Sequence, residues 1–254
     1  MIYFIGAGPG DTELITLKGA RILAEADCVI YAGSLINREL LDNVKSGCEL
    51  YDSAKMTLEE VAAIMLENEK NKLITARLHT GDPSIYGAIK EQIDILAENG
   101  VSYEIIPGVS SFAAAAAALG AEYTLPGISQ TVILTRMEGR TPVPKGESIL
   151  ELAKIQASMA IFLSGAMLGE LSAKLMEGGY PKDTPAAIVY KASWPEEKII
   201  HTTVEELNEA GARHNISKTA IILVGNFLSG EYERSKLYDP AFSHGYRIGR
   251  NCDE

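Results

Sequence analysis

Residues 2–11 read IYFIGAGPGD, and this stretch decides the fold. Its first four residues form a short apolar run that stops at a glycine, which is the pattern of a buried strand. The glycines that follow permit positive φ angles and a close approach of other backbone. Thr16 is placed to cap a helix that runs from Leu17 to about Ala26. The opening therefore predicts a strand, a polar glycine loop and a helix.

The same order of strand, loop and helix recurs through the first half of the chain. Further apolar strands are expected at Cys28–Tyr31, 72–77 and 102–106. Helices are expected at 57–69, where Thr57 and Glu60 form a capping box, at 84–98, which ends at Asn99-Gly100, and at 110–119. Strands that alternate with helices imply parallel βαβ units.

A second domain is expected after Pro126-Gly127, which breaks the helical pattern. We place an N-terminal α/β domain at 1–122, a C-terminal α+β domain at 123–240 and a tail at 241–254. Strands are expected at 131–136, 159–164, 186–190, 198–202 and 219–224, with a helix at 166–177 and a second capping box at Thr203 and Glu206. A mixed sheet is favoured over a purely parallel one.

Composition excludes several classes of protein. The net charge of −11 is opposite to that of a nucleic-acid binder, so no nucleic-acid partner is expected. The three cysteines are odd in number and widely spaced, which fits a reducing cytosol rather than a disulfide framework. The N-terminus lacks the pattern of a signal peptide, and no apolar run approaches about 20 residues. A cytoplasmic protein with no membrane span is therefore expected.

Two more glycine-bearing loops follow strands and precede helices. Residues 77–87 read RLHTGDPSIYG, and residues 107–111 read PGVSS. Loops after parallel strands gather at one edge of the sheet, where α/β proteins bind ligands. Backbone groups, hydroxyls and the Asp82 carboxylate would suit a neutral or cationic nucleoside better than a polyphosphate. The alternatives are that Asp82 only caps a helix, that Ser110 and Ser111 are only N-caps, and that His79 is a satisfied loop histidine.

A dinucleotide site and a metal site are both disfavoured. The first loop has the spacing G-x-G-x-G, and Asp11 would oppose a pyrophosphate at the helix N-terminus. The second strand also ends without an acid to bind a ribose. No two of the four histidines have metal-ligand spacing, and no G-x-S-x-G nucleophile motif is present. The sequence thus predicts no resident metal.

Taken together, the three loops resemble those of the tetrapyrrole methylases. The matching segments are Ile5–Leu17, Gly81-Asp82-Pro83 and Pro107–Ser111, and the similarity extends to about Leu237. The resemblance implies two α/β domains with S-adenosylmethionine in the cleft between them, S-adenosylhomocysteine as product, and usually a homodimer. It places cofactor contacts at Pro9, Thr80, Gly81, Asp82, Ile85, Ser110, Ser111, Leu163, Ala192 and Ala220. It names no catalytic residue.

Two segments point to one branch of this family. Tyr31–Leu35 and Thr135–Pro142 resemble the enzymes that methylate C11 of precorrin-4 in cobalamin synthesis, with or without cobalt in the ring. Uroporphyrinogen-III methyltransferases usually carry Leu-Lys-Gly-Gly-Asp-Pro-Phe, whereas residues 78–84 here read LHTGDPS. That enzyme, a non-catalytic nucleotide-binding module and a nicotinamide dehydrogenase remain as alternatives.

The implied substrate is a tetrapyrrole that carries many carboxylates, although the chain itself is acidic. Local cations are therefore required, and arginine suits bidentate binding of a carboxylate. The candidate substrate-binding residues are Tyr31, Ser34, Arg136, Arg140 and Lys191.

Overall fold

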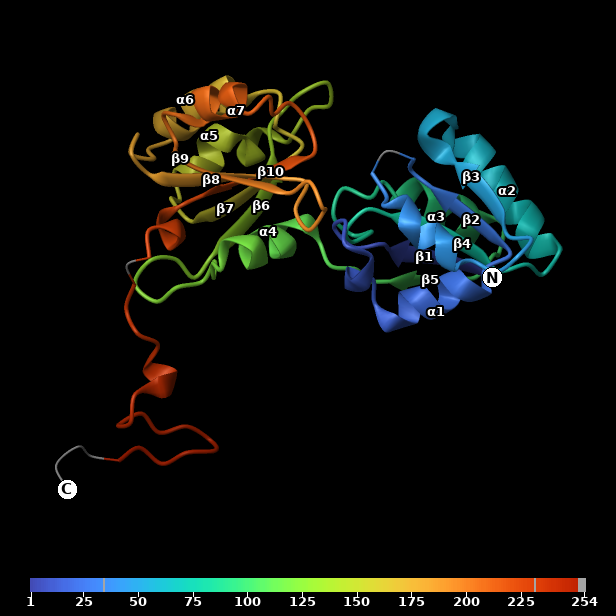
Figure 1. Ribbon diagram of the computed structural model, residues 1–254, viewed down its shortest axis with the longest axis horizontal. Coiled ribbons are helices and arrows are strands. Elements are labelled where there is room, and N and C mark those ends of the chain that lie inside the picture. The colour runs from blue at the N-terminus through green and yellow to red at the C-terminus, as the bar shows by residue number, and fades with distance from the viewer. Residues whose placement is uncertain (34, 231, 251–254) are drawn as a thin grey trace. The chain divides into compact units, whose positions relative to one another are not determined.

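The computed structural model describes residues 1–33, 35–230 and 232–250, and it contains two compact units, each built on a five-stranded sheet (Figure 1). The first unit comprises Met1–Ala115 together with Lys191–Glu197, and the second comprises Ala116–Tyr190 and Lys198–Glu254. The expected α/β class is confirmed. No helix in the described part of the chain is long and apolar enough to cross a membrane.

The sheet of the first unit is parallel throughout. Its strands are β1 (Ile2–Gly6), β2 (Cys28–Tyr31), β3 (Glu49–Asp52), β4 (Thr75–His79) and β5 (Tyr103–Ile106). They lie in the order β3-β2-β4-β1-β5, so β1 lies between β4 and β5. Since the strands all point the same way, the loops that leave β4, β1 and β5 start side by side at one edge of the sheet.

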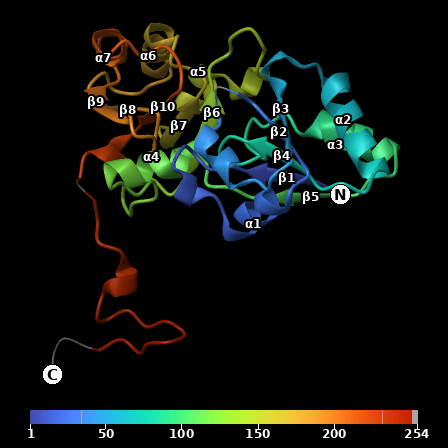
Figure 2. The same ribbon diagram turned by 45° about the vertical axis from the view of Figure 1, so that its right-hand side comes forward.

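Helices cover both faces of this sheet, with α1 (Leu17–Glu25) on one and α2 (Leu58–Lys70) and α3 (Lys90–Glu98) on the other (Figure 2). Side chains alternate along β1, so Ile5 joins the cluster that contains Ile22 of α1. Phe4 joins the cluster of Met65 and Leu96 from α2 and α3. The caps of α1 and α2 form as predicted, including the Thr57–Glu60 box. The helix α4 (Ser111–Leu119) follows β5.

Two predicted boundaries in the first unit are wrong. The helix expected at 84–98 begins at Lys90, because Tyr86 and Ala88 have φ of 55° and 48°, which no helix residue adopts. The strand expected at 72–77 is instead Thr75–His79, and Lys72, at φ 57°, lies in the turn before it. The edge strand β3 was not anticipated, since most of its side chains are exposed and carry no hydrophobic pattern.

The second unit has the mixed sheet that the sequence favoured. Its strands are β6 (Val132–Arg136), β7 (Ser158–Phe162), β8 (Pro185–Tyr190), β9 (Lys198–Thr203) and β10 (Ala220–Val224), in the order β6-β7-β10-β8-β9. The pair β6–β7 is parallel and the other pairs are antiparallel. Short 3-10 helices elsewhere in the chain lie at Thr12–Leu14, Arg38–Asn43, Ser53–Lys55, Lys145–Glu147, Asn226–Leu228 and Lys236–Tyr238.

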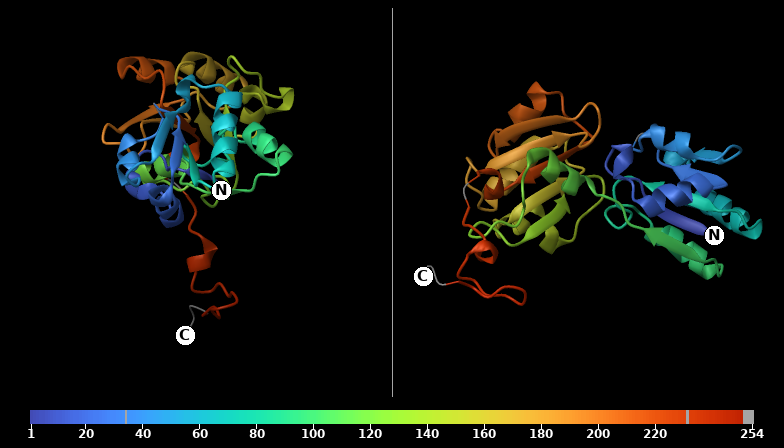
Figure 3. Two further views of the ribbon diagram at one scale, coloured as in Figure 1. Left: turned by 90° about the vertical axis from the view of Figure 1, so that its right-hand side faces the viewer. Right: turned by 60° about the horizontal axis from the view of Figure 1, so that its bottom comes forward.

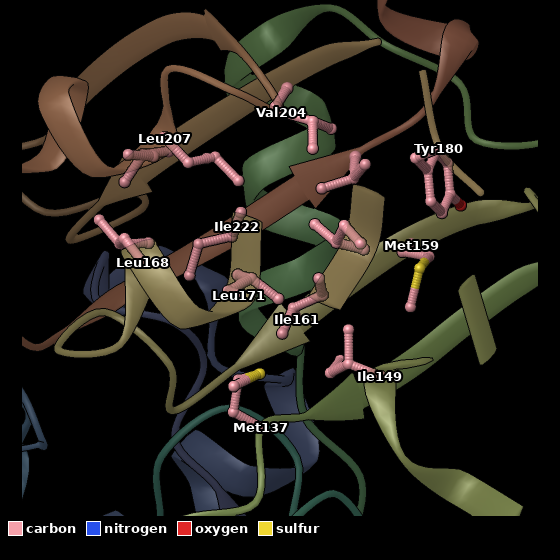
Figure 4. Close-up of a cluster of buried hydrophobic side chains, with 14 of the residues drawn as sticks. Met137, Ile149, Met159, Ile161, Leu168, Leu171, Tyr180, Val204, Leu207 and Ile222 are labelled. Atoms are coloured by element: carbon pink, nitrogen blue, oxygen red, sulfur yellow. The ribbon is translucent and has the colours of Figure 1, made fainter. Parts of the chain in front are cut away.

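The core of the second unit lies between this sheet and the helices α5 (Ile149–Ala153), α6 (Leu168–Glu177) and α7 (Leu207–Arg213) (Figure 3). Ile161 and Ile222 of the strands lie close to Leu168 and Leu171 of α6 (Figure 4). The predicted helix at 166–177 is thus confirmed to within two residues at its start.

The second predicted capping box is wrong. Helix α7 has Glu206 as its N-cap, and that residue makes no side-chain cap bond. Thr203 is instead the last residue of β9, and its Oγ1 is buried without a hydrogen-bond partner among the described residues. The strand pairing of Thr203 with Pro185 prevails over the local capping pattern.

Candidate functional site

Three loops extend from neighbouring strands at the carboxyl edge of the first sheet. We call residues 7–11 after β1 the first glycine loop, residues 80–87 after β4 the second, and residues 107–111 after β5 the third. The predicted clustering of these loops is therefore present within the first unit.

The first and second glycine loops are joined through their backbones. The Ala7 N–H donates to the His79 carbonyl at 2.8 Å. Gly81 donates to the Gly8 carbonyl at 2.8 Å, and Gly8 donates to the Gly81 carbonyl at 3.4 Å, so the two glycines form an isolated bridge. Both have positive φ, 79° for Gly8 and 65° for Gly81, which glycine adopts without strain. The two loops thereby stay paired beyond the strands, through an antiparallel bridge that differs from the parallel pairing of β1 and β4.

The third glycine loop approaches the second loop and Gly6, the last residue of β1, so closely that no side chain fits between them. A Cβ atom on Gly108 would lie 2.2 Å from the Gly81 carbonyl oxygen and 2.7 Å from the Gly6 Cα. A Cβ atom on Gly6 would lie 2.5 Å from the Gly108 Cα. Backbone thus packs on backbone here, which explains the glycines at positions 6 and 108.

Asp82 holds the second loop against the third. Its Oδ2 accepts a hydrogen bond from the Gly108 N–H at 2.8 Å, and its Oδ1 accepts bonds from the N–H and the hydroxyl of Ser84. Burial acts to raise the pKa of Asp82, but the Ser84 hydroxyl and the two N–H groups outweigh it and hold that pKa below its usual range. Asp82 does not cap α3, whose N-cap Ile89 makes no side-chain cap bond.

The loops present peptide groups, hydroxyls and one clamping carboxylate, and none of their residues is lysine, arginine or histidine. Ser110 is buried, and Ser111 is the first residue of α4. Thr80 donates its hydroxyl to the Leu35 carbonyl at 2.9 Å, which ties the second loop to the segment after β2. Without a local cation, such a site favours a neutral or positively charged ligand over a polyphosphate.

A fourth segment, which we call the returning segment, lies against the first glycine loop. It comprises Lys191–Glu197, follows β8 in the chain, and belongs to the first unit. The Trp194 Nε1–H donates to the Pro9 carbonyl at 2.8 Å, and the Asp11 N–H donates to the Ser193 hydroxyl at 3.0 Å. Ala192, which the family resemblance singled out, is buried in the same segment. Trp194 is the single tryptophan of the chain, and no sequence pattern predicts a role for it.

His79, the last residue of β4, is buried at 7% exposure, beside the Phe4 ring at 5.9 Å between centroids. Burial, followed by the Arg77 charge, lowers the pKa of His79 to about 3. Its Nε2 has no hydrogen-bond partner among the described residues. The imidazole is therefore neutral at physiological pH and packs as part of the sheet.

The predicted substrate residues have more varied surroundings. Tyr31 lies in the core cluster of α1, with 9% of its surface exposed. The Arg136 guanidinium donates to three loop carbonyls, those of residues 137, 141 and 142, at 2.9–3.2 Å. Lys191 pairs with Glu196 at 3.4 Å. Arg140 is exposed and forms no ion pair within the described residues, and Ser34 lies outside them.

Two predicted cofactor residues belong to the second unit. Leu163 follows β7 with φ 54° and is 70% exposed, so its side chain packs little against its own unit. Ala220 is the first residue of β10 and pairs with Tyr190 of β8. Ile85, from the second glycine loop, is half-buried in the first unit. Their contacts with a ligand stay predictions.

Comparison with known proteins gives the same family as the loops. A family model described as Tetrapyrrole (Corrin/Porphyrin) Methylases matches residues 1–208. The cobalt-precorrin-4 C(11)-methyltransferase of Methanocaldococcus jannaschii is 53% identical over 249 residues, which cover 97% of this chain and 95% of that protein. The precorrin-4 C(11)-methyltransferase of Pseudomonas aeruginosa is 43% identical, with 98% and 99% covered.

Solved structures agree. An X-ray structure of a cobalamin biosynthetic enzyme, cobalt precorrin-4 methyltransferase, matches with a TM-score of 0.88 and 48% identity, over 89% of this chain and 95% of that one. The uroporphyrin-III C-methyltransferase of Thermus thermophilus, complexed with S-adenosyl homocysteine, matches with a TM-score of 0.75 and 26% identity, over 90% and 98%. The three glycine loops of this chain are joined as described above, and the family model matches most of its length. This chain therefore belongs to the tetrapyrrole methylase family.

Proposed function

We propose that this chain transfers the methyl group of S-adenosylmethionine to C11 of precorrin-4 or of its cobalt form. The observation that carries the proposal is the joining of the three glycine loops at one sheet edge, with Asp82 as their clamp and no cation among them. The relatives named for C11 methylation match nearly the whole chain, which supports the position of transfer.

The residues present fit S-adenosylmethionine. Its sulfonium is a cation, and the loops offer carbonyl dipoles and two carboxylates, those of Asp11 and Asp82, without an opposing positive charge. Its adenosine presents hydroxyls and ring nitrogens, which pair with peptide groups and with the hydroxyls of Ser110 and Ser111. Glycine at position 108 lets the loop backbones pack against one another, and glycine at position 81 adopts its positive φ without strain. Pro9, Gly81 and Asp82 would contact the cofactor directly.

The chemistry is a displacement in which one bond forms as another breaks. S-adenosylmethionine supplies an electrophilic methyl group when it is bound. The new bond joins that methyl to a ring carbon of the tetrapyrrole, the electrons of the carbon–sulfur bond stay with sulfur, and the ring later loses a proton. The protein must align the reacting carbon with the methyl group and exclude water.

Asp82 is a poor candidate for the base that removes the ring proton. Both of its oxygens already accept hydrogen bonds within the loops. Its lowered pKa also makes it a weak proton acceptor at neutral pH. We therefore assign Asp82 to loop positioning and cofactor binding, and the proton to solvent or to the substrate itself.

Carboxylates of the substrate need cations, and Arg140 is the candidate with the freest charge. The Arg136 guanidinium donates hydrogen bonds to loop carbonyls, and Lys191 forms an ion pair with Glu196. Arg136 would then act by holding the 137–142 loop, on which Arg140 is carried. Replacement of Arg140 by alanine is expected to raise the KM for the tetrapyrrole and to leave cofactor affinity unchanged.

The test combines binding with turnover. Calorimetric titration with S-adenosylhomocysteine should show binding to the wild type and weaker binding to Asp82→Asn, with NAD as a control ligand. The protein is then incubated with ¹³C-methyl S-adenosylmethionine and precorrin-4, its cobalt form or uroporphyrinogen III, and the methylated carbon is located by NMR. Label at C11 supports the proposal.

Label found only on uroporphyrinogen III would instead favour that substrate. Cofactor binding with no turnover on any of the three tetrapyrroles would favour a non-catalytic module. The resemblance also leads us to propose a homodimer, and sedimentation equilibrium of the whole chain tests this directly. A mass equal to one chain across the concentration range would refute it.

A further inference from the structure

We propose that the returning segment, Lys191–Glu197, acts as a clasp that holds the first glycine loop in its cofactor-binding conformation, with Trp194 and Ser193 as positioning residues. This inference deepens the proposed function and rests on it. Neither residue was singled out by the sequence or by the family resemblance.

The clasp binds the first loop at consecutive peptide groups. Trp194 donates to the Pro9 carbonyl at 2.8 Å, and Ser193 accepts from the Asp11 N–H at 3.0 Å. Between these two bonds, the Gly10 carbonyl accepts from the Asn37 Nδ2 at 2.9 Å. Two carbonyls and one N–H of residues 9–11 are therefore fixed from outside the loop.

Gly10 shows how closely the indole lies on the loop. A Cβ atom built on Gly10 would lie 2.1 Å from the Trp194 Cδ1 and 2.2 Å from its Nε1. No residue other than glycine fits under the ring, and the ring blocks movement of the loop toward Trp194. The ring thus acts as a wall as well as a hydrogen-bond donor.

The returning segment is itself held in an unusual backbone shape. Lys191 and Ser193 have φ of 49° and 67°, a region that non-glycine residues rarely adopt. The Glu197 carboxylate accepts from the Ser193 N–H at 2.6 Å, and the Lys191 ammonium lies 5.1 Å from the Trp194 ring centre. These contacts keep the Ser193 hydroxyl and the indole N–H aimed at the first loop.

The opposite side of the first loop is already fixed, because Gly8 pairs with Gly81 of the second loop. A glycine-rich segment held on one side only would populate many conformations, and the affinity of a ligand falls by the fraction of protein that is competent to bind it. The clasp raises that fraction. Its loss should weaken cofactor binding without touching any atom of the cofactor.

The first experiment compares Trp194→Phe with the wild type. Phenylalanine retains a ring over Gly10 but has no N–H for the Pro9 carbonyl. Loss of one hydrogen bond predicts about two- to tenfold weaker binding of S-adenosylhomocysteine by calorimetry. The KM for S-adenosylmethionine should rise by the same factor while kcat at saturating cofactor stays within about twofold. Tyr238→Phe, which also removes a polar group from an aromatic ring, is the matched control and should bind as the wild type.

The second experiment begins with a measurement that needs no cofactor. Trp194 is the single tryptophan, so its fluorescence reports on the clasp alone. Ser193→Ala removes the acceptor for the Asp11 N–H, and acrylamide should then quench the fluorescence more strongly than in the wild type. Ser193→Ala should also bind S-adenosylhomocysteine about two- to tenfold more weakly.

The outcomes separate this inference from the proposed function. If the wild type itself does not bind S-adenosylhomocysteine, the proposed function fails. If the wild type binds and both variants bind equally well, with unchanged quenching, the clasp is refuted while the function stands. Equal loss of kcat and of cofactor affinity, together with a lower midpoint of thermal unfolding, would make Trp194 a purely structural residue and would also overturn the inference.

Discussion

The closest approach between the glycine loops gives the sharpest prediction, which concerns Gly108→Ala. The added methyl group would lie 2.2 Å from the Gly81 carbonyl oxygen and 2.7 Å from the Gly6 Cα. Both neighbours are backbone atoms, so neither can turn aside as a side chain would. The third loop must therefore move away by about 1 Å, because contacts this short are not tolerated in a close-packed interior.

The size of the effect follows from what that movement disrupts. Forcing a methyl group into a packed site costs about 1–3 kcal/mol. The movement also lengthens the bond from the Gly108 N–H to the Asp82 carboxylate, now 2.8 Å, and a hydrogen bond to a charged group is worth about 1.5–3 kcal/mol. We expect Gly108→Ala to lower the free energy of unfolding of the first unit by about 3–5 kcal/mol.

Urea unfolding followed by Trp194 fluorescence measures this directly, because the single tryptophan belongs to the first unit. Gly100→Ala is the matched control. Gly100 has φ 66° but nothing within 4 Å of an added Cβ, so it should cost only about 1 kcal/mol of backbone strain. A Gly108→Ala protein no less stable than Gly100→Ala would show that the loops can separate freely, and the reasoning would be wrong.

Three further results are expected. Asp82 has a folded pKa below its unfolded value, so its stabilising contribution is present above about pH 4 and is lost as the pH falls through the folded pKa. The difference in unfolding free energy between the wild type and Asp82→Asn should therefore shrink below about pH 4. A constant difference in urea titrations would contradict this. The pKa of His79 is lowered to about 3, so this histidine takes up its proton in the unfolded chain before it does so in the folded one. The free energy of unfolding therefore falls as the pH drops from about 6.5 toward 3, by up to about 1.4 kcal/mol per pH unit. His79→Gln should remove this slope above pH 4, and an unchanged slope would assign it to other groups. Arg136→Lys keeps the charge but cannot bridge three carbonyls, so amide hydrogen exchange of residues 137–142 should speed up, whereas unchanged protection would mean that the loop holds its shape without the guanidinium.

Much of the first unit could be predicted because its signals are local. The apolar runs at β1 and β2, the Thr57–Glu60 box and the turn at Gly100 each act within a few residues, and each appears where expected. The clustering of the three loops followed from a general rule for parallel sheets, which needs no detail of packing.

The remainder depends on contacts between distant residues. The helix start at Lys90 is a local exception, because the positive φ angles of Tyr86 and Ala88 exclude a helix before it and no side-chain pattern reveals those angles. The Asp82–Gly108 clamp and the Trp194–Pro9 bond join residues 26 and 185 positions apart. The side-chain types identified polar residues at these sites but did not determine which hydrogen-bond partner each residue has in the fold.

The returning segment also sets an order of events during synthesis. The sheet of the first unit is complete once β5 has left the ribosome, yet the segment that holds its first loop is made only after all of β6, β7 and β8. In a nascent chain, the first glycine loop therefore cannot complete its contacts until residues 191–197 have been added. For the same reason, a fragment cut at Ala115 would lack Trp194, and producing an intact first unit alone requires that residues 191–197 be joined to it through a linker or supplied as a second piece.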